Sequence, residues 1–422
     1  MRFEPDAAFA ERWDKKDELG HYRKEFVFSD PNLIYLDGNS LGRLTLKSAQ
    51  QVKDVVEKGW GEDLIRRWNK GWYEAPSRVG DKIATLIGAA PEQVIVADST
   101  SINLFKLVMA ALAMRPDRRV VISDTLNFPS DLYILQGCIQ LMGGDHQLRL
   151  VSSGDGIQIE EDSFLEAIDE GTALLTFSHV AFKSGYAFDV KKIADRVHHA
   201  GAMILVDLSH SVGVLPIELD SWGVDLAVGC TYKYLNGGPG SPAFLYVRKE
   251  IQRQALSPIW GWFGQHKPFD FDLEYRAADS IRRFLVGTPP ILSLLAIEPA
   301  LDIIREAGID RIRKKSTDLT SYLIYLIQEE LVTLGFKLGS PIDPEKRGSH
   351  VSLRHPEGYR INRALIEEMS LLPDFREPDL IRLGLAPLYT SFLDVWEAVQ
   401  RIKKVVIEGR YRKYSKERFG VT

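Results

Sequence analysis

The sequence predicts an α/β fold in which a mostly parallel β-sheet lies between layers of helices, followed by a smaller α+β domain. Across residues 92–230, short apolar, β-branched segments alternate with helix-like segments. This order is typical of parallel strands joined by crossover helices. After about residue 290 the pattern changes to long helices separated by short strand-like segments. A chain of 422 residues is also long enough to divide into two domains.

The individual elements can be placed along the chain in order. Residues 46–60 have apolar side chains at helical spacing. The strand-like segments are 92–98, 118–124, 173–179, 202–208 and 225–230, and the helix-like segments between them are 102–114, 131–142 and 189–201. In the C-terminal part, helices are expected at 311–335 and 392–409, around strand-like segments at 349–355 and 380–387. We therefore expect an N-terminal segment (1–50) that packs with the small domain, a large domain (51–295) and a small C-terminal domain (296–422).

Composition excludes several classes of protein. The net charge of −5 gives no basic excess for nucleic acid, and no apolar segment is long enough to span a membrane. Residues 1–16 lack the apolar core of a signal peptide. Two cysteines, Cys138 and Cys230, are too few for a disulfide framework and lack the spacing of metal ligands. We expect a cytoplasmic protein that binds a small molecule, without a metal.

Polar side chains follow the predicted strands at the points where they end. Ligands of open parallel sheets bind outside the carboxyl ends of the strands, so these residues are candidates for a site. They are Ser99, Thr100, Ser101, Ser178, His179, Asp207, His210, Tyr232 and Lys233.

Three features among these positions together match the needs of pyridoxal 5′-phosphate (PLP), which requires a lysine, an acid for its ring nitrogen and an anion site. Lys233 stands beside the small-residue loop LNGGPGSP and can form a Schiff base, although a solvent-facing lysine explains it equally well. Asp207 ends an apolar strand and needs a positive partner. The hydroxyls of Thr100 and Ser101 can cradle a phosphate or simply cap a helix. Phe128 can stack on a ring or pack in the core.

Several segments resemble one family of PLP enzymes with the aspartate-aminotransferase-like fold, the kynureninases. They are LDGNSLG (36–42), NFPSD (127–131), VDLSHSVG (206–213), WGVDLAVGCTYKYLNGGPG (222–240), GWFG (261–264), GTPPIL (287–292) and IRLGLAPLYTSF (381–392). They extend over nearly the whole chain. One position departs from the pattern, because Thr288 stands where some members of the family carry asparagine.

The resemblance implies a PLP-dependent hydrolase of tryptophan catabolism that cleaves the Cβ–Cγ bond of L-kynurenine, or of its 3-hydroxy form, to give anthranilate and L-alanine. It implies that Lys233 holds the cofactor and moves the Cα proton, that Asp207 faces the ring nitrogen and that Tyr232 donates a proton. Arg382 is expected to bind the substrate carboxylate, with Ser40 and Trp68 in the substrate pocket. The further cofactor contacts implied are Thr100, Ser101, Phe128, Asp131, Ser178, His210, Trp262 and Thr288.

The family also implies a homodimer in which each active site is completed by the neighbouring chain. Trp262 and Thr288 are the residues expected to come from the neighbour. The substrate is then a small amino acid.

Three other interpretations were weighed. GNSLG (38–42) matches the nucleophile elbow G-x-S-x-G of a serine hydrolase, but too little chain precedes it for the earlier strands of that fold. GPGSPA (238–243) matches a dinucleotide fingerprint, yet a strand-like segment follows it where a helix is required. A cysteine desulfurase needs a reactive cysteine on a mobile loop, and neither cysteine has such a position.

Overall fold

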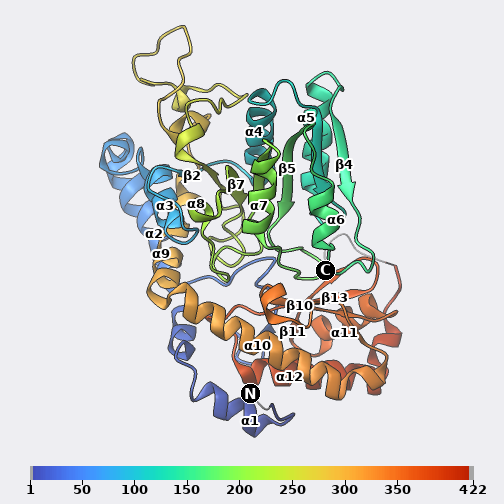
Figure 1. The fold of residues 1–422 in the computed structure, drawn as a ribbon. Helices are drawn as coiled ribbons and strands as arrows, with labels where there is room; N and C mark the ends of the chain where they lie inside the picture. Colours follow the sequence, from blue (N-terminus) through green and yellow to red (C-terminus); the bar gives the residue numbers. More distant parts are fainter. Residues whose placement is uncertain (1–2, 418–422) are drawn as a thin grey trace.

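The computed structural model describes residues 3–417, and a seven-stranded sheet forms the centre of its larger part (Figure 1). The strand order is β2-β8-β7-β6-β5-β3-β4. All neighbours from β7 to β4 are parallel, whereas β8 is antiparallel to both β2 and β7. The predicted, mostly parallel sheet is thereby confirmed. Its strands are β2 (Val94–Val96), β3 (Val120–Asp124), β4 (Gln147–Val151), β5 (Thr172–Ser178), β6 (Met203–Asp207), β7 (Leu226–Gly229) and β8 (Phe244–Val247).

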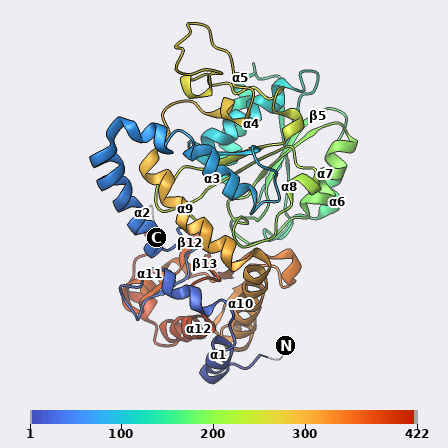
Figure 2. The same ribbon diagram turned by 90° about the vertical axis from the view of Figure 1, so that its left-hand side faces the viewer.

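Helices cover both faces of this sheet (Figure 2). On one face, Val121, Leu174 and Leu205 pack in a core with α4 (Thr100–Ala113) and α5 (Pro129–Leu141). On the other face, Ile122 and Ile204 pack in a core with helices that include α3 (Ala75–Ala84), α7 (Val190–His199) and α9 (Ile291–Ala307). Because side chains alternate between faces along a strand, burial of both faces requires the unbroken apolar segments seen in the sequence. Two shorter helices, α6 (Glu161–Glu166) and α8 (Leu219–Trp222), complete this part.

The C-terminal domain contains a four-stranded antiparallel sheet with the order β12-β13-β10-β9. Phe9 of the N-terminal helix and Ile34 and Leu36 after it share a core with this domain. Part of the N-terminal segment therefore packs with the C-terminal domain, whereas Leu19, Tyr22 and Phe26 share the core of the large sheet. The division into domains stays a prediction. The elements are α1 (Ala7–Asp14), β1 (Ile34–Tyr35), β9 (Lys337–Leu338), α10 (Ile309–Glu330), β10 (His350–Arg354), α11 (Gly358–Glu368), β11 (Leu371–Leu372), β12 (Asp374–Arg376), β13 (Leu380–Gly384) and α12 (Phe392–Ile407).

The helix expected over residues 46–60 is divided in the structure. An α-helix, α2 (Leu46–Asp54), continues into a π-helical segment (Val55–Asp63) and then a 3₁₀ segment (Leu64–Lys70). Glycine disfavours regular α-helix, and Gly59 and Gly61 lie within the π-helical segment. Gly59 also packs closely against Trp72, because a Cβ atom there would lie 3.1 Å from the indole.

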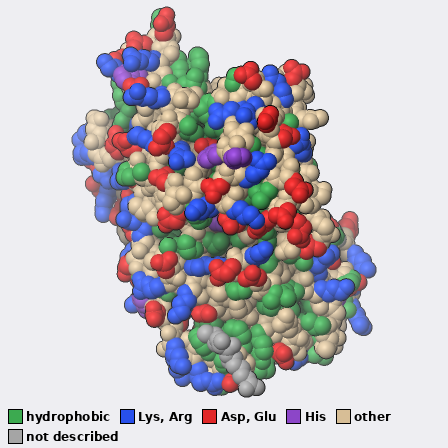
Figure 3. All heavy atoms as spheres, in the orientation of Figure 1, with side chains coloured by type: hydrophobic (Ala, Val, Ile, Leu, Met, Phe, Trp, Pro, Cys, Tyr) green, Lys and Arg blue, Asp and Glu red, His purple; other side chains and the backbone are tan. Residues whose placement is uncertain are grey.

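The face of the molecule drawn in Figure 3 does not carry charges of a single sign. Figure 3 shows acidic and basic side chains intermixed over the visible side of the molecule. Within residues 3–417, every helix is either too short or too polar to cross a membrane.

Candidate active site

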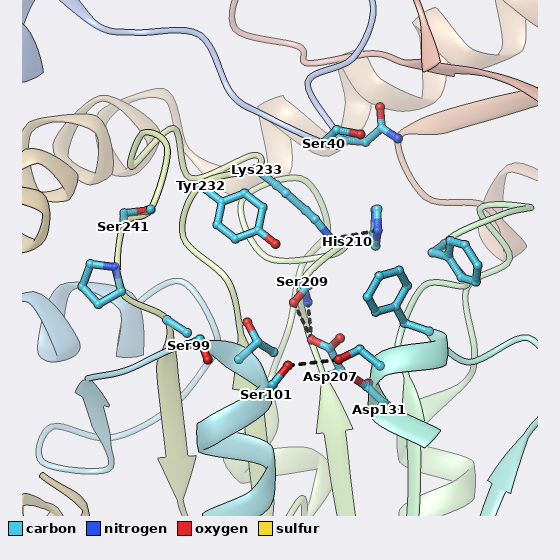
Figure 4. Close-up of a pocket in the computed structure, with 18 of the residues that line it drawn as sticks. Ser40, Ser99, Ser101, Asp131, Asp207, Ser209, His210, Tyr232, Lys233 and Ser241 are labelled. Carbon is cyan, nitrogen blue, oxygen red and sulfur yellow. Dashed lines mark hydrogen bonds between the residues drawn. The ribbon is translucent and has the colours of Figure 1, made fainter. Parts of the chain in front are cut away.

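A cavity of about 570 Å³ lies where the carboxyl ends of the central strands face the C-terminal domain (Figure 4). The large sheet contributes Asp207 from the end of β6 and Lys233 from the loop after β7. Helix α4 begins at its wall, and the strands β12 and β13 contribute Arg376 and Arg382. Residues far apart in the sequence thus meet at one edge of the sheet.

The Lys233 amine points into this cavity toward His210 (Figure 4), with 3.0 Å between Nζ and the histidine Nε2. Burial, and next the charge of Lys233, hold the pKa of His210 well below its ordinary value, so its imidazole is neutral. His210 Nδ1 is buried and finds no hydrogen-bond partner among residues 3–417. A close backbone approach also shapes this loop, since a Cβ on Gly42 would lie 2.3 Å from the Lys233 carbonyl oxygen.

Two acids, Asp207 and Asp131, are buried at the floor of the cavity. Asp207 Oδ1 accepts hydrogen bonds from the Ser209 backbone N–H (2.8 Å) and hydroxyl (2.6 Å). Burial raises the pKa of Asp207, and the nearby Lys233 opposes that rise. Burial and the charge of Asp207 raise the pKa of Asp131. Buried acids of this kind are stabilised by a positive ligand group between them and the solvent.

The opposite wall of the cavity is suited to an anion. Ser99 is the N-cap of α4 and accepts a hydrogen bond from the Ile102 N–H (3.4 Å), and Thr100 and Ser101 occupy the first turn. The first N–H groups of a helix carry partial positive charge and bind phosphate readily. Ser241, beside Gly240, adds a further hydroxyl to this wall.

The residues of the cavity therefore fit PLP on their own chemistry. They supply an amine for the aldehyde, a buried acid for the ring nitrogen and a helix start with hydroxyls for the phosphate. The unpartnered Nδ1 of buried His210 is a further polar atom that a ligand can satisfy.

Most of the predicted site residues line this cavity, although their individual roles stay predictions. Those in the lining are Ser40, Thr100, Ser101, Phe128, Asp131, Asp207, His210, Tyr232, Lys233 and Arg382.

Four predicted site residues lie outside the lining. Ser178 is buried beside Asp207 in the sheet and donates to Asn127 Oδ1 (2.8 Å). Trp68 packs against Phe263 and lines a separate cavity of about 370 Å³. Trp262 and Thr288 are exposed on the surface of the single chain.

Comparison with known proteins gives close relatives along the whole chain. A family model described as the kynureninase C-terminal domain matches residues 312–402. A kynureninase from Geobacillus thermodenitrificans is 41% identical over 98% of this chain and 98% of its own. Those from Pseudomonas fluorescens and Burkholderia mallei are 41% and 42% identical, each over 93% of this chain and 94% of the relative. The chain belongs to the kynureninase family. As a kynureninase it is a PLP-dependent hydrolase of carbon–carbon bonds, which confirms the resemblance and the cofactor predicted from the sequence.

Solved structures of lower identity share the fold of this kynureninase. A cysteine desulfurase from Thermococcus onnurineus superposes with a TM-score of 0.80 at 20% identity, covering 92% of this chain and 98% of the other. One from Escherichia coli has a TM-score of 0.77 at 16% identity, over 93% and 98%. At these identities the likeness shows the fold alone. A desulfurase needs a reactive cysteine, whereas burial raises the pKa of the Cys138 thiol to about 12 and also raises that of Cys230.

The hydrolase and dinucleotide motifs have other structural explanations in this kynureninase. The Ser40 hydroxyl donates to Asp374 Oδ2 (2.9 Å), whereas a nucleophile would need a histidine base. The segment 238–243 leads into strand β8 rather than a helix. Within residues 3–417, no group of three or more His, Cys, Asp or Glu side chains is arranged to hold a metal ion.

Sequence reasoning missed several residues of the lining. Ser209 lies two residues after Asp207 in the segment VDLSHSVG, and Ser130 lies next to Asp131, so the position of each beside a predicted site residue is a signal that could have indicated it. Phe182 lies in the loop after β5, four residues beyond the strand end, and was not singled out. Arg376 had no local signal, because the packing of the C-terminal domain on the large sheet brings it to the cavity.

Proposed function

We propose that this enzyme hydrolyses L-kynurenine to anthranilate and L-alanine. The observation that carries the proposal is that one cavity holds an amine (Lys233), a buried acid (Asp207) and a guanidinium (Arg382). An α-amino acid offers a matching amine and carboxylate. The relatives are named kynureninases, which points to kynurenine as the amino acid.

PLP, when bound, supplies an electron-accepting ring that stabilises the negative charge left when bonds to the amino acid break. The residues of the chain hold and move the protons. Asp207 keeps a proton at the ring nitrogen, a role supported by its burial and its hydrogen bonds from Ser209. Lys233 takes the Cα proton, and neutral His210 accepts a hydrogen bond from its amine and so directs it.

Tyr232 is the proposed proton donor. Burial raises the pKa of its phenol above the ordinary value, so the group keeps its proton at neutral pH. Its position next to Lys233 in the cavity wall lets it serve a substrate held there. Water adds to the aryl ketone, the Cβ–Cγ bond breaks, anthranilate leaves with the added oxygen, and the alanine fragment gains a proton.

The test is the release of anthranilate, followed by fluorescence, with L-kynurenine and 3-hydroxy-L-kynurenine assayed side by side. We expect turnover of L-kynurenine and its loss by about a thousandfold or more in Lys233→Ala, because the amine is the proton carrier. Lys191→Ala, at an exposed lysine on α7, is the matched control and should keep full activity. Wild-type activity in Lys233→Ala, or no product from either substrate, would refute the proposal.

We also propose that the enzyme is a homodimer with its active sites at the interface. Aromatic side chains are exposed along residues 260–273, here called the aromatic loop, which projects from the large sheet (Figure 1). Trp262 belongs to this loop, and both Trp262 and Thr288 are exposed outside their own cavity. Surfaces of this kind are typical of protein interfaces.

A cytoplasmic location is part of the same proposal. Cys138 and Cys230 are both buried and unpaired, which suits a reducing compartment.

A further inference from the structure

The guanidinium of Arg382 is almost fully engaged before any substrate arrives. The residue is 2% exposed, and its Nε donates to Asp374 Oδ1 (2.8 Å). Its Nη2 pairs with Asp374 Oδ2 and donates to Ser40 Oγ (3.0 Å), and its Nη1 donates to the Phe182 carbonyl oxygen (2.5 Å). A guanidinium has five N–H groups, so one is left over within the described part of the chain. Arg382 alone therefore cannot form a two-bond fork with a carboxylate while Asp374 holds it.

A second guanidinium, Arg376, lines the same cavity with its side chain 35% exposed. Asp374 and Arg376 are alternate residues of β12 and share one face, and Asp374 lies opposite Arg382 in the register with β13. Arg376 Nη2 lies 2.8 Å from Asp374 Oδ2, and its Nη1 donates to the Phe375 carbonyl oxygen (2.9 Å). These contacts leave three of its five N–H groups for a ligand, among contacts to residues 3–417.

The charge balance of this cluster favours an anion. Asp374 is ionised, because the two arginines hold its pKa below the ordinary value against the effect of burial. The remaining acid is Asp37, whose pKa is raised to about 7 by burial and by the charge of Asp374. Its Oδ1 is buried without a partner in the described structure. Near neutral pH, two guanidiniums therefore face one full negative charge and a partly protonated acid.

We propose that Arg376 is a binding residue for the substrate carboxylate, acting together with Arg382. The carboxylate takes the one remaining N–H of Arg382 and a fork of two N–H groups from Arg376. Asp374 orients both guanidiniums by holding one edge of each. This assignment rests on the proposed function, since it places the carboxylate of the amino-acid substrate at this end of the cavity.

The test compares ligands that differ only in this group. The probes are 4-(2-aminophenyl)-4-oxobutanoate, which lacks the α-amine and so cannot react at the cofactor, and its primary amide. Binding to the holoenzyme is measured by calorimetry, with Arg376→Gln, Arg376→Lys and the exposed control Arg12→Gln. We expect Arg376→Gln to reduce the preference for carboxylate over amide by about tenfold or more, Arg376→Lys to fall between, and Arg12→Gln to match the wild type.

Kinetics supply a second readout. The KM for L-kynurenine should rise by about tenfold or more in Arg376→Gln with kcat little changed, because the contact holds the carboxylate before and during the reaction. An unchanged carboxylate preference, or an equal loss of affinity for acid and amide, would overturn the proposal. If Arg376→Gln does not fold, the charge-conserving Arg376→Lys decides by the same comparison. A wild type that binds the probe but releases no anthranilate would refute the proposed function and leave the test of Arg376 intact.

Discussion

Asp124, at the end of β3, is a buried acid whose charge the fold does not neutralise. Its Oδ1 accepts a hydrogen bond from the Leu126 N–H (2.8 Å), while Oδ2 is buried without a partner among residues 3–417. Burial raises the pKa of this carboxyl from 3.8 to about 7, and the backbone hydrogen bonds of Leu126 and Asn127 only partly offset that rise. Asp124 therefore affects stability through its proton rather than through an ion pair.

The sign of this effect can be tested with Asp124→Asn. Between about pH 4 and pH 7, Asp124 is ionised in the unfolded chain but keeps its proton in the folded protein. The folded protein is therefore stabilised by the protonated acid most fully below about pH 4, and this stability is lost as the pH rises to about 7. The amide keeps the acceptor and carries no charge. We compare the free energy of unfolding of the variant with that of the wild type at each pH. We expect this difference to favour the variant by about 2–3 kcal/mol more at pH 8 than at pH 5.

Thermal unfolding of the holoenzyme at the two pH values measures this difference. Asp117→Asn, at an exposed aspartate just before the same strand, is the matched control for the substitution itself. An equal gain for Asp124→Asn at pH 5 and pH 8 would mean that the carboxyl is already ionised in the fold.

Single residues of the site were predictable where a strand end carried them. Asp207 is the last residue of the apolar strand β6, and Lys233 lies in the loop just after the apolar strand β7, so the pattern itself indicates their place at the sheet edge. Arg376 was not predictable in this way, because its place depends on how β12 packs against another sheet. Trp68 was expected in the substrate pocket but lines a different cavity of the single chain.

At the scale of elements, two long helices start at serine caps with different surroundings. Ser99 begins α4 at the cavity wall, and Ser391 begins α12 in the C-terminal domain. Ser391 is part of a capping box. Its hydroxyl accepts a hydrogen bond from the Asp394 N–H (3.0 Å), and the Asp394 carboxylate accepts one from the Ser391 N–H (2.9 Å). The Ser99 hydroxyl can accept from the helix and still donate its own hydrogen to a ligand.

Alanine at these two caps should separate stability from cofactor binding. Ser391→Ala is expected to cost about 1 kcal/mol of stability, and Ser99→Ala less, because its hydrogen bond from Ile102 is long at 3.4 Å. Only Ser99→Ala should weaken PLP binding, by about tenfold, since it removes a donor to a charged phosphate. Thermal unfolding and titration of the apoenzyme with PLP give both quantities. If Ser99→Ala binds PLP as tightly as the wild type, Ser99 caps the helix but does not bind the phosphate.

The elements that were predicted correctly are those whose burial leaves a clear pattern. Strands β5, β6 and β7 are buried on both faces and are therefore continuous apolar segments. The edge strand β4 has a mixed sequence, QLRLV, and was missed because half of it faces solvent. The change from α2 to a π-helical segment depends on contacts such as that of Gly59 with Trp72, which no periodicity reveals.

At the scale of the whole molecule, the cavity exists only because two sheets face each other. We propose the boundaries 51–295 and 296–422 for the two domains, with residues 1–50 packing against the second. The shared core of Phe9 and Ile34 with the C-terminal domain supports this division. Helix α9 packs in the core of the large sheet as far as Ala307, beyond the proposed boundary at 295, and Gly308 separates it from α10. The structure therefore favours a dividing point near Gly308.

The aromatic loop gives the prediction for the assembled molecule. Phe271 is 72% exposed and has a φ of 52°, a backbone conformation that is costly for a bulky residue and persists where packing enforces it. Leu273 is fully exposed in the same loop. A partner chain that buries both would explain the arrangement, and Trp262 beside them would then reach the neighbouring active site.

Phe271→Asp should therefore shift the protein from dimer to monomer, because a charge would have to be buried in an apolar interface. Light scattering measures the mass, and turnover of L-kynurenine should fall as the monomer fraction rises if, as we propose, Trp262 and Thr288 of one chain complete the site of the other. Ile342→Asp, at an exposed isoleucine of the C-terminal domain, is the matched control and should leave mass and turnover unchanged. A fully active monomer would exclude a contribution from the neighbouring chain, and a Phe271→Asp protein that stays dimeric would place the interface on another face.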